Sequence, residues 1–445
     1  MSIWRIHAYV DESKLDNLKS YSYHGEDHSL LAAQLQPFWS FLARQLPDWL
    51  APNLITLIGL VAVFLGYVAV CVFVPELTPA ATAAAPAWLW LFASASLFTY
   101  QTLDALDGKQ ARRTGTSSPL GELFDHGCDA ISTAMCVLLA SAALQYEPWM
   151  NTVSICTAMF AFYLGQWEEF HTGTLYLGYV NVTEALVTIE LVLVAAAVVG
   201  PTYLRESGVS AFVFYGSTAA AVVSAAQYFY RTVATLRRSK QSVAAALQRL
   251  VPIVALVSVS FLWARFSKVD VGAEHHYAFA NIVGLTGSAL VGRLVLARML
   301  KSTVSPFQWS LVPLTLVAAN DALLDTPLVD PRTAIVGLVV YCAVAYLHFA
   351  MYVITTLCAT LGIRCLTITP KVAASATATA AILDASGSTS GAESTTAPSS
   401  RRSRSRSPAR STRTQSRSPA RAARSNTPTR APSQRTRVEP EKLNL

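Results

Sequence analysis

Residues 52–75 read PNLITLIGLVAVFLGYVAVCVFVP, a run of 24 residues that contains no charged side chain. A helix of about 20 predominantly apolar residues is long enough to cross the hydrocarbon core of a bilayer. The stretch therefore predicts a membrane-spanning helix, and the rest of the chain can be searched for segments of the same kind.

Nine further apolar segments follow the first. The ten predicted spans lie at residues 52–75, 87–107, 119–145, 149–167, 183–204, 209–230, 248–266, 276–298, 306–324 and 333–360. Of the 445 residues, 53% are hydrophobic and only 14% are charged, whereas soluble domains average about 25% charged residues. We therefore expect an all-α polytopic membrane protein with about ten transmembrane helices.

The positive charge of the chain is confined to its C-terminal end. The whole chain carries a formal charge of +7, but residues 401–445 alone carry +11, which leaves −4 for residues 1–400. This distribution excludes a nucleic-acid-binding core. We expect a cytoplasmic N-terminal segment at 1–45, a membrane domain at 46–365, and a disordered Arg/Ser/Pro-rich cytoplasmic tail at 366–445, which has too little apolar surface to fold.

Basic residues favour one orientation in the membrane. Lys and Arg are enriched in the short loops on the cytoplasmic side. If the N-terminus is cytoplasmic, the loops on its side contain most of the basic residues near the spans, namely Lys109, Arg112, Arg113, Arg231, Arg237, Arg238, Lys240, Arg298 and Lys301. The loops on the other side contain Arg205, Lys268 and Arg332. Both termini and the region 104–129 are therefore predicted to be cytoplasmic.

The region 104–129 joins two predicted spans and is rich in carboxylates. It contains LDALDGKQARR at residues 103–113 and PLGELFDHGCD at residues 119–129. Positions three, four and seven apart share one face of a helix. Asp104, Asp107, Gly108 and Ala111 thus form one stripe, and Glu122, Asp125, His126 and Asp129 form a second. Ser118 and Pro119 suit the N-cap and first turn of the second helix.

Two facing stripes would bring four aspartates into one space. Such charges repel one another unless cations neutralise them, and hard divalent ions with oxygen ligands suit this role. We expect Asp104, Asp107, Asp125 and Asp129 to bind two Mg²⁺ or Mn²⁺ ions. Zn²⁺ is less suitable because no His/Cys cluster accompanies the carboxylates.

Small and basic residues next to the aspartates indicate a phosphate ligand. Gly108 and Ala111 allow a ligand to approach the helix backbone closely. Arg112 suits bidentate binding of a phosphate group. The combination predicts a two-metal phosphoryl-transfer site at the cytoplasmic face of the membrane.

The pattern Asp104-x2-Asp107-Gly108-x2-Ala111-Arg112-x8-Gly121-x3-Asp125-x3-Asp129 resembles the full signature of the CDP-alcohol phosphatidyltransferase family. The sequence around this pattern is similar to that of the eukaryotic choline/ethanolamine phosphotransferases. So are Pro52-Asn-Leu-Ile-Thr56 at the first span and Trp167-Glu-Glu169 after the fourth. The resemblance covers roughly residues 40–365 and leaves the tail outside.

The resemblance implies a reaction and its participants. CDP-choline or CDP-ethanolamine would react with diacylglycerol to give phosphatidylcholine or phosphatidylethanolamine and CMP. The family implies ten helices, often as a homodimer, in endoplasmic reticulum or Golgi membranes. By resemblance the four aspartates match its metal positions, and Asn53 and Arg112 match positions near the nucleotide. Glu122, Gly108 and Ala111 complete the residues expected to contact the donor.

The acceptor hydroxyl must lose a proton as it attacks phosphorus. His126 is our candidate base because an imidazole titrates near neutral pH, and Glu122, four residues earlier, could orient it. Asp129 is the alternative, although a carboxylate bound to cations is a weak base.

The headgroup of the donor calls for aromatic faces or a carboxylate. The candidates at the cytoplasmic ends of spans are Tyr100, Trp167, Glu168, Glu169 and Tyr176. Each aromatic residue could instead belong to an interfacial belt.

Other functions remain open at this point. A sibling enzyme could use a different acceptor, such as inositol. A prenyltransferase would need aspartate-rich motifs on separate helices and an isoprenoid pyrophosphate. A cation transporter could also contain intramembrane carboxylates, but transporters place them near the midplane, often with inverted repeats, and no repeat is evident here.

Overall fold

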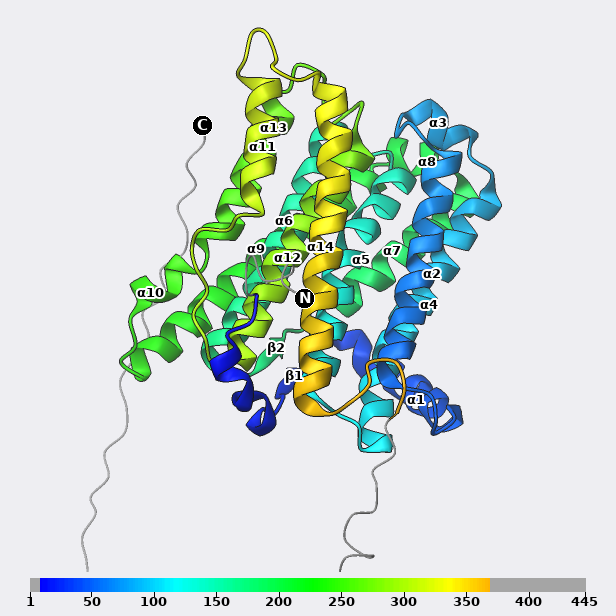
Figure 1. The fold of residues 1–445 in the computed structure, drawn as a ribbon. Helices are drawn as coiled ribbons and strands as arrows, with labels where there is room; N and C mark the ends of the chain where they lie inside the picture. Colours follow the sequence, from blue (N-terminus) through cyan, green and yellow to red (C-terminus); the bar gives the residue numbers. More distant parts are fainter. Residues whose placement is uncertain (1–8, 369–445) are drawn as a thin grey trace, which may run out of the picture. The chain divides into compact units, whose positions relative to one another are not determined.

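The computed structural model describes residues 9–368, which form a helical membrane domain (Figure 1). Residues 1–8 and 369–445, and with them most of the predicted tail at 366–445, lie outside the described residues. The helices are α1 (Leu30–Gln45), α2 (Pro52–Phe73), α3 (Pro79–Ala84), α4 (Ala87–Thr114), α5 (Pro119–Ala143), α6 (Pro148–Thr172), α7 (Val182–Val199), α8 (Pro201–Glu206), α9 (Val209–Arg238), α10 (Val243–Gln248), α11 (Val251–Phe266), α12 (His276–Met299), α13 (Leu311–Ala322) and α14 (Pro331–Leu361).

Each of the ten predicted segments is largely helical, from α2 to α14, but the predicted span 183–204 is divided at Gly200 into α7 and α8. Six of these helices, α2, α5, α7, α9, α12 and α14, are long and apolar enough to cross a membrane, so the protein is an integral membrane protein. Two more, α11 and α13, are shorter apolar helices. The long helices α4 and α6 are not among the six, and they bury polar side chains such as Gln101 and Asn151.

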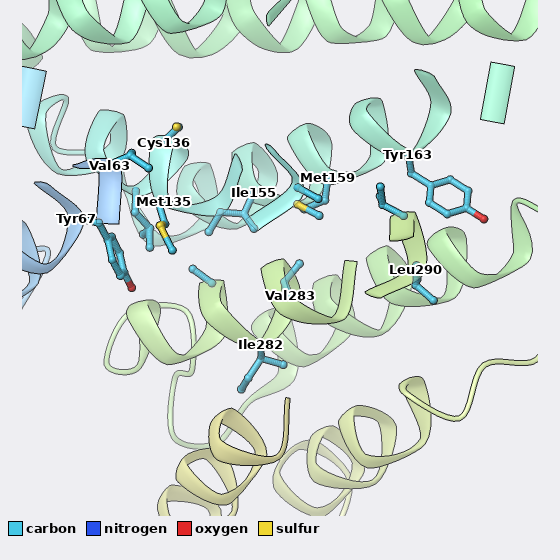
Figure 2. Close-up of a cluster of buried hydrophobic side chains, with 14 of the residues drawn as sticks. Val63, Tyr67, Met135, Cys136, Ile155, Met159, Tyr163, Ile282, Val283 and Leu290 are labelled. Atoms are coloured by element: carbon cyan, nitrogen blue, oxygen red, sulfur yellow. The ribbon is translucent and has the colours of Figure 1, made fainter. Parts of the chain in front are cut away.

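The helix α12 lies at the centre of the domain. In its most apolar stretch 78% of the residues are buried, compared with 11% for the peripheral α9. A Cβ atom on Gly287 would lie 2.4 Å from the terminal methyl of Met159, so a larger residue would force this side chain of α6 to shift. Figure 2 shows Val283 pointing toward Ile155 and Met159 of α6, while Ile282 points away on the other side of α12. Because α12 is held from several sides, its C-terminal end is a rigid support.

The N-terminal segment packs against the membrane domain. It contains a 3₁₀ helix at Glu12–Ser20 and the strand β1 (Gly25–Asp27), which pairs in parallel with β2 (Leu175–Leu177) after α6. These two short strands are the exception to the all-α prediction within residues 9–368. The Asn17 side-chain amide also donates to the Leu300 carbonyl at 2.9 Å. The segment is thereby held across the ends of α6 and α12, where the candidate site lies.

Candidate active site

The turn between α4 and α5 brings the predicted carboxylates together. The helix α4 ends at Gly115, whose φ of 64° suits glycine. Ser118 then caps α5, because its hydroxyl accepts a hydrogen bond from the Gly121 N–H at 3.1 Å. This confirms the predicted start of the helix. The chain reverses direction here, so the last turns of α4 face the first turns of α5.

Four aspartates meet between these helices. One carboxylate oxygen from each of Asp104, Asp107 and Asp125 lies within 4.8 Å of the others. Asp129, one turn after Asp125, interacts with Asp104. We call these four residues the aspartate cluster. The Thr56 hydroxyl donates to Asp107 at 2.5 Å, which connects the cluster to α2.

Within the described part of the chain, no basic side chain pairs with the aspartate cluster. The nearby arginines are engaged elsewhere: Arg113 pairs with Asp48, and Arg298 pairs with two glutamates. Among residues 9–368, no Lys or Arg forms an ion pair with the four aspartates. The Asp125 Oδ1 atom is buried and has no hydrogen-bond partner. Carboxylates gathered without a cation from the described chain fit divalent cations with oxygen ligands.

A second group of titratable side chains lies beside the first. Glu122, His126 and Glu169 also bring one ligand atom each within 4.8 Å of one another. Arg298 of α12 forms ion pairs with both Glu122 and Glu169. We call these four residues the histidine cluster. Because Arg298 pairs with both carboxylates and offsets one of their two charges, this cluster is a poorer metal site than the aspartate cluster and a suitable place for an uncharged imidazole.

Two tyrosines of the N-terminal segment close the histidine cluster. The Tyr21 hydroxyl donates to Glu122 Oε1 at 2.9 Å. The Tyr23 ring lies edge-on to His126 at 6.3 Å between ring centres. His126 is buried, and its Nδ1 has no hydrogen-bond partner. A reactant could therefore form a hydrogen bond with this nitrogen.

The predicted donor-binding residues surround the aspartate cluster. Asn53 is buried at the start of α2, and a Cβ atom on Gly121 would lie 3.6 Å from its Oδ1. The Arg112 guanidinium lies over Gly108, where an added Cβ would come within 3.4 Å of it. Arg112 is exposed and forms no ion pair with any residue in 9–368. Ala111 is partly buried on the same helix. These positions leave Arg112 available to an anionic ligand.

Of the five headgroup candidates, Glu169 belongs to the histidine cluster and Tyr176 stacks with Arg231, while the other three lie in different surroundings. The Tyr100 hydroxyl donates to Asp129 Oδ1 at 2.6 Å, so Tyr100 touches the aspartate cluster. Trp167 is fully buried, and its Nε1 donates to the Ala246 carbonyl of α10. Glu168 pairs with Arg231 of α9. The structure thus joins Tyr100 to the aspartates, whereas Trp167 and Glu168 face α9 and α10.

Sequence reasoning did not identify several residues of the site. It counted Arg298 only as a loop charge and took no account of Tyr21, Tyr23 or Thr56. Arg298 could have been noticed, since a basic residue in an apolar helix usually has a partner. The contacts of the tyrosines depend on chain segments about 100 residues apart, and no local pattern indicates them.

Comparisons with known proteins agree with the site. A family model described as CDP-alcohol phosphatidyltransferase matches residues 49–170. Choline/ethanolaminephosphotransferase 1 of Arabidopsis thaliana is 34% identical over 394 residues, which cover 82% of this chain and 99% of the plant protein. An uncharacterized class-I protein of the same family from Dictyostelium discoideum is 32% identical, covering 82% of this chain and 96% of its own. Cholinephosphotransferase 1 of Gallus gallus is 42% identical over a shorter stretch, 44% of this chain and 58% of the chicken protein.

Proposed function

Because the chain belongs to the CDP-alcohol phosphatidyltransferase family, we propose that it transfers phosphocholine, phosphoethanolamine or both from the CDP-alcohol to diacylglycerol. The products are phosphatidylcholine or phosphatidylethanolamine and CMP. The plant relative, named for both headgroups and matched along nearly its whole length, supports this substrate class. The observation that carries the proposal is the placement of the aspartate cluster beside the histidine cluster on α5. Membership of an enzyme family argues against a cation transporter.

The aspartate cluster is assigned to the donor. Asp104, Asp107, Asp125 and Asp129 would hold two Mg²⁺ or Mn²⁺ ions. When bound, such ions would stabilise the negative charge that develops on the pyrophosphate. Arg112 would bind a phosphate oxygen of the CDP-alcohol, and this assignment is supported by its lack of an ion pair within residues 9–368.

The small residues and the amide near the cluster are assigned to the nucleotide. Gly108 and Ala111 would let it lie against α4. Asn53 and Glu122 complete the proposed donor contacts, from the start of α2 and of α5.

His126 is assigned as the general base. It would take the proton of the diacylglycerol hydroxyl on its unpartnered Nδ1 while the acceptor oxygen bonds to the phosphorus that bears the headgroup. The bond from this phosphorus to the CMP oxygen breaks in the same displacement. Glu122 would orient His126, and a carboxylate oxygen of Glu169, like one of Glu122, lies within 4.8 Å of an imidazole nitrogen. Asp129 remains the alternative base, but it belongs to the aspartate cluster and accepts a hydrogen bond from the Tyr100 hydroxyl.

The headgroup site is proposed near Tyr100. Of the three candidates it is the one that touches the aspartate cluster. The other two, Trp167 and Glu168, are engaged by α9 and α10, so their role as headgroup contacts has less support.

The membrane arrangement is also part of the proposal. We propose that the ten predicted segments all cross the membrane, with the site and both termini on the cytoplasmic side. The enzyme would act in the endoplasmic reticulum or Golgi, often as a homodimer. The basic residues at one set of helix ends support this orientation.

Purified full-length protein tests the proposal directly. It would be incubated with diacylglycerol and either CDP-choline or CDP-ethanolamine, with Mg²⁺ or with EDTA, and phospholipid formation measured. We expect product from at least one donor in Mg²⁺ and none in EDTA. If folded protein gives no product from either donor but converts CDP-diacylglycerol and inositol, it is a sibling enzyme with a different acceptor.

A further inference from the structure

A second cavity lies outside the candidate active site. Its volume is about 430 Å³, and it is bounded by α12, α14 and the chain that connects α12 to α13. One part of its lining is apolar and includes Leu285, Ala289 and Phe349, whereas the other includes Arg293, Ser305 and Gln308. Both α12 and α14 are candidate membrane spans. The cavity is therefore amphipathic, and it lies between the central helix α12 and the more exposed helix α14.

Arg293 is a cation with no anionic partner among the described residues. Its NH1 donates to Gln308 Oε1 at 2.8 Å, and its Nε is buried with no hydrogen-bond partner. No carboxylate in residues 9–368 forms an ion pair with it. Charged residues within membrane helices are costly and almost always have a partner or a function. The arrangement calls for an anionic group from outside the described chain.

Aromatic rings fix the guanidinium beside the cavity. It lies 5.2 Å from the centre of the Tyr9 ring and 5.9 Å from that of Phe349. Phe349 can approach α12 because residue 292 is glycine, where a Cβ would lie 2.8 Å from the ring. The Tyr9 hydroxyl in turn forms a hydrogen bond with His348 Nδ1 at 3.0 Å. The cation is thus held in position before any ligand binds.

We propose that this cavity binds a phospholipid, with the phosphodiester on Arg293 and an acyl chain along Leu285, Ala289 and Phe349. A guanidinium can bind two oxygens of a phosphate group at once. Basic pockets between membrane helices bind phospholipid headgroups in the same way. Free phosphate has the same charged group, but it would leave the apolar part of the cavity unfilled. Diacylglycerol would fill the apolar part, but it has no anion for Arg293.

The cavity is separate from the candidate active site but adjoins it. Tyr346 lines the cavity, and its hydroxyl donates to the carbonyl of Gly127, the residue after His126. Arg298 of the histidine cluster follows Arg293 by five residues on α12. A bound phospholipid would therefore brace the helix that positions Arg298, without reaching the aspartates.

Native mass spectrometry of the full-length protein tests the proposal. Delipidated protein in detergent would be titrated separately with phosphatidylcholine, diacylglycerol and inorganic phosphate. We expect wild type to retain one more phosphatidylcholine than Arg293→Gln, with affinity at least about tenfold weaker in the variant. Arg238→Gln, which removes an exposed charge at the end of α9 on the same membrane face, should behave like wild type.

A second variant guards against misfolding of the first. Ala289→Phe fills the apolar part of the cavity and leaves the guanidinium intact, and it should also lose one phosphatidylcholine. A phosphatidylcholine with a diazirine on its acyl chain should label α12 or α14 in wild type and not in Ala289→Phe. Equal phosphatidylcholine retention in wild type and both variants would overturn the proposal. So would retention of inorganic phosphate or diacylglycerol, in place of phosphatidylcholine, at this site.

Discussion

The aspartate cluster and the histidine cluster both contain residues of α5, yet they differ in charge. The first has four carboxylates and no cation from residues 9–368, whereas the second has two carboxylates and Arg298. The sequence predicts one stripe from Glu122 to Asp129. In the structure Asp125 and Asp129 turn toward α4, and Glu122 and His126 turn toward α6 and α12.

The difference shows how one helix can support two kinds of chemistry. Carboxylates without a cation are suited to a ligand that brings positive charge, as a metal ion does. Carboxylates that already pair with an arginine can hold an imidazole while competing less for the metal. Variants of either cluster, or of the residues that contact it, test this difference in charge.

The largest effect is expected from the aspartate cluster. EDTA, or Asp129→Asn, should lower phospholipid formation from radiolabelled CDP-choline or CDP-ethanolamine by roughly 10³-fold or more, because the charge on the pyrophosphate is no longer stabilised. Asp325→Asn is the matched control, since Asp325 is exposed and pairs only at the surface with Lys268. Full activity of metal-free protein would refute the assignment of this cluster.

Loss of the proposed base should have a smaller effect. His126→Ala should lower kcat by about 10²–10⁴-fold, the usual contribution of a general base, while the Mg²⁺ concentration that gives half-maximal activity stays the same. The measurement is a Mg²⁺ titration of turnover for both enzymes. If His126→Ala keeps near-normal turnover and Asp129→Asn with metal bound does not, Asp129 is the base.

The contrast in charge should also appear in stability. Arg298→Gln leaves two buried carboxylates unpaired and should lower the free energy of unfolding by about 3–5 kcal/mol. Asp125→Asn should instead stabilise metal-free protein, because it removes repulsion within the aspartate cluster. Thermal unfolding in detergent with EDTA measures both.

Two controls make this comparison specific. Arg332→Gln breaks an exposed pair with Glu274 and should change the free energy of unfolding by at most about 1 kcal/mol. Adding Glu169→Gln to Arg298→Gln should recover part of the loss. Equal stability of Arg298→Gln and Arg332→Gln would show that Arg298 does not neutralise the histidine cluster.

The smallest effect is expected at the N-terminal segment. Tyr21→Phe removes one hydrogen bond to Glu122 and should lower the free energy of unfolding by about 1 kcal/mol. Burial raises the pKa of Tyr21 above its usual value, so the hydroxyl stays protonated and donates. The difference from wild type should therefore be constant between about pH 6 and 9. Tyr203→Phe, at an exposed position, is the control, and a difference that vanished toward pH 9 would contradict a neutral donor.

Sequence periodicity predicted most of the fold because bilayer spans need long apolar runs. All ten segments are helical, although 183–204 is divided between α7 and α8, and α13 has 12 residues where 306–324 was predicted. The helix α9 continues to Arg238, past the predicted end at 230. The prediction followed the apolar run, and the helix extends beyond it. The N-terminal segment was predicted only as polar, since β1 exists through its pairing with β2 about 150 residues later.

The sequence by itself identified a membrane protein, its family and the positions of the four aspartates. These depend on local composition and on fixed spacing along two helices. Only the tertiary structure decided that Arg298 neutralises Glu122 and Glu169, and that Tyr21 reaches Glu122. It likewise decided that Arg293 lines a cavity without an anion from the described chain. These contacts join α12 and the N-terminal segment to α5 and α6, and the partner of a buried charge is set by how helices pack rather than by their order in the chain.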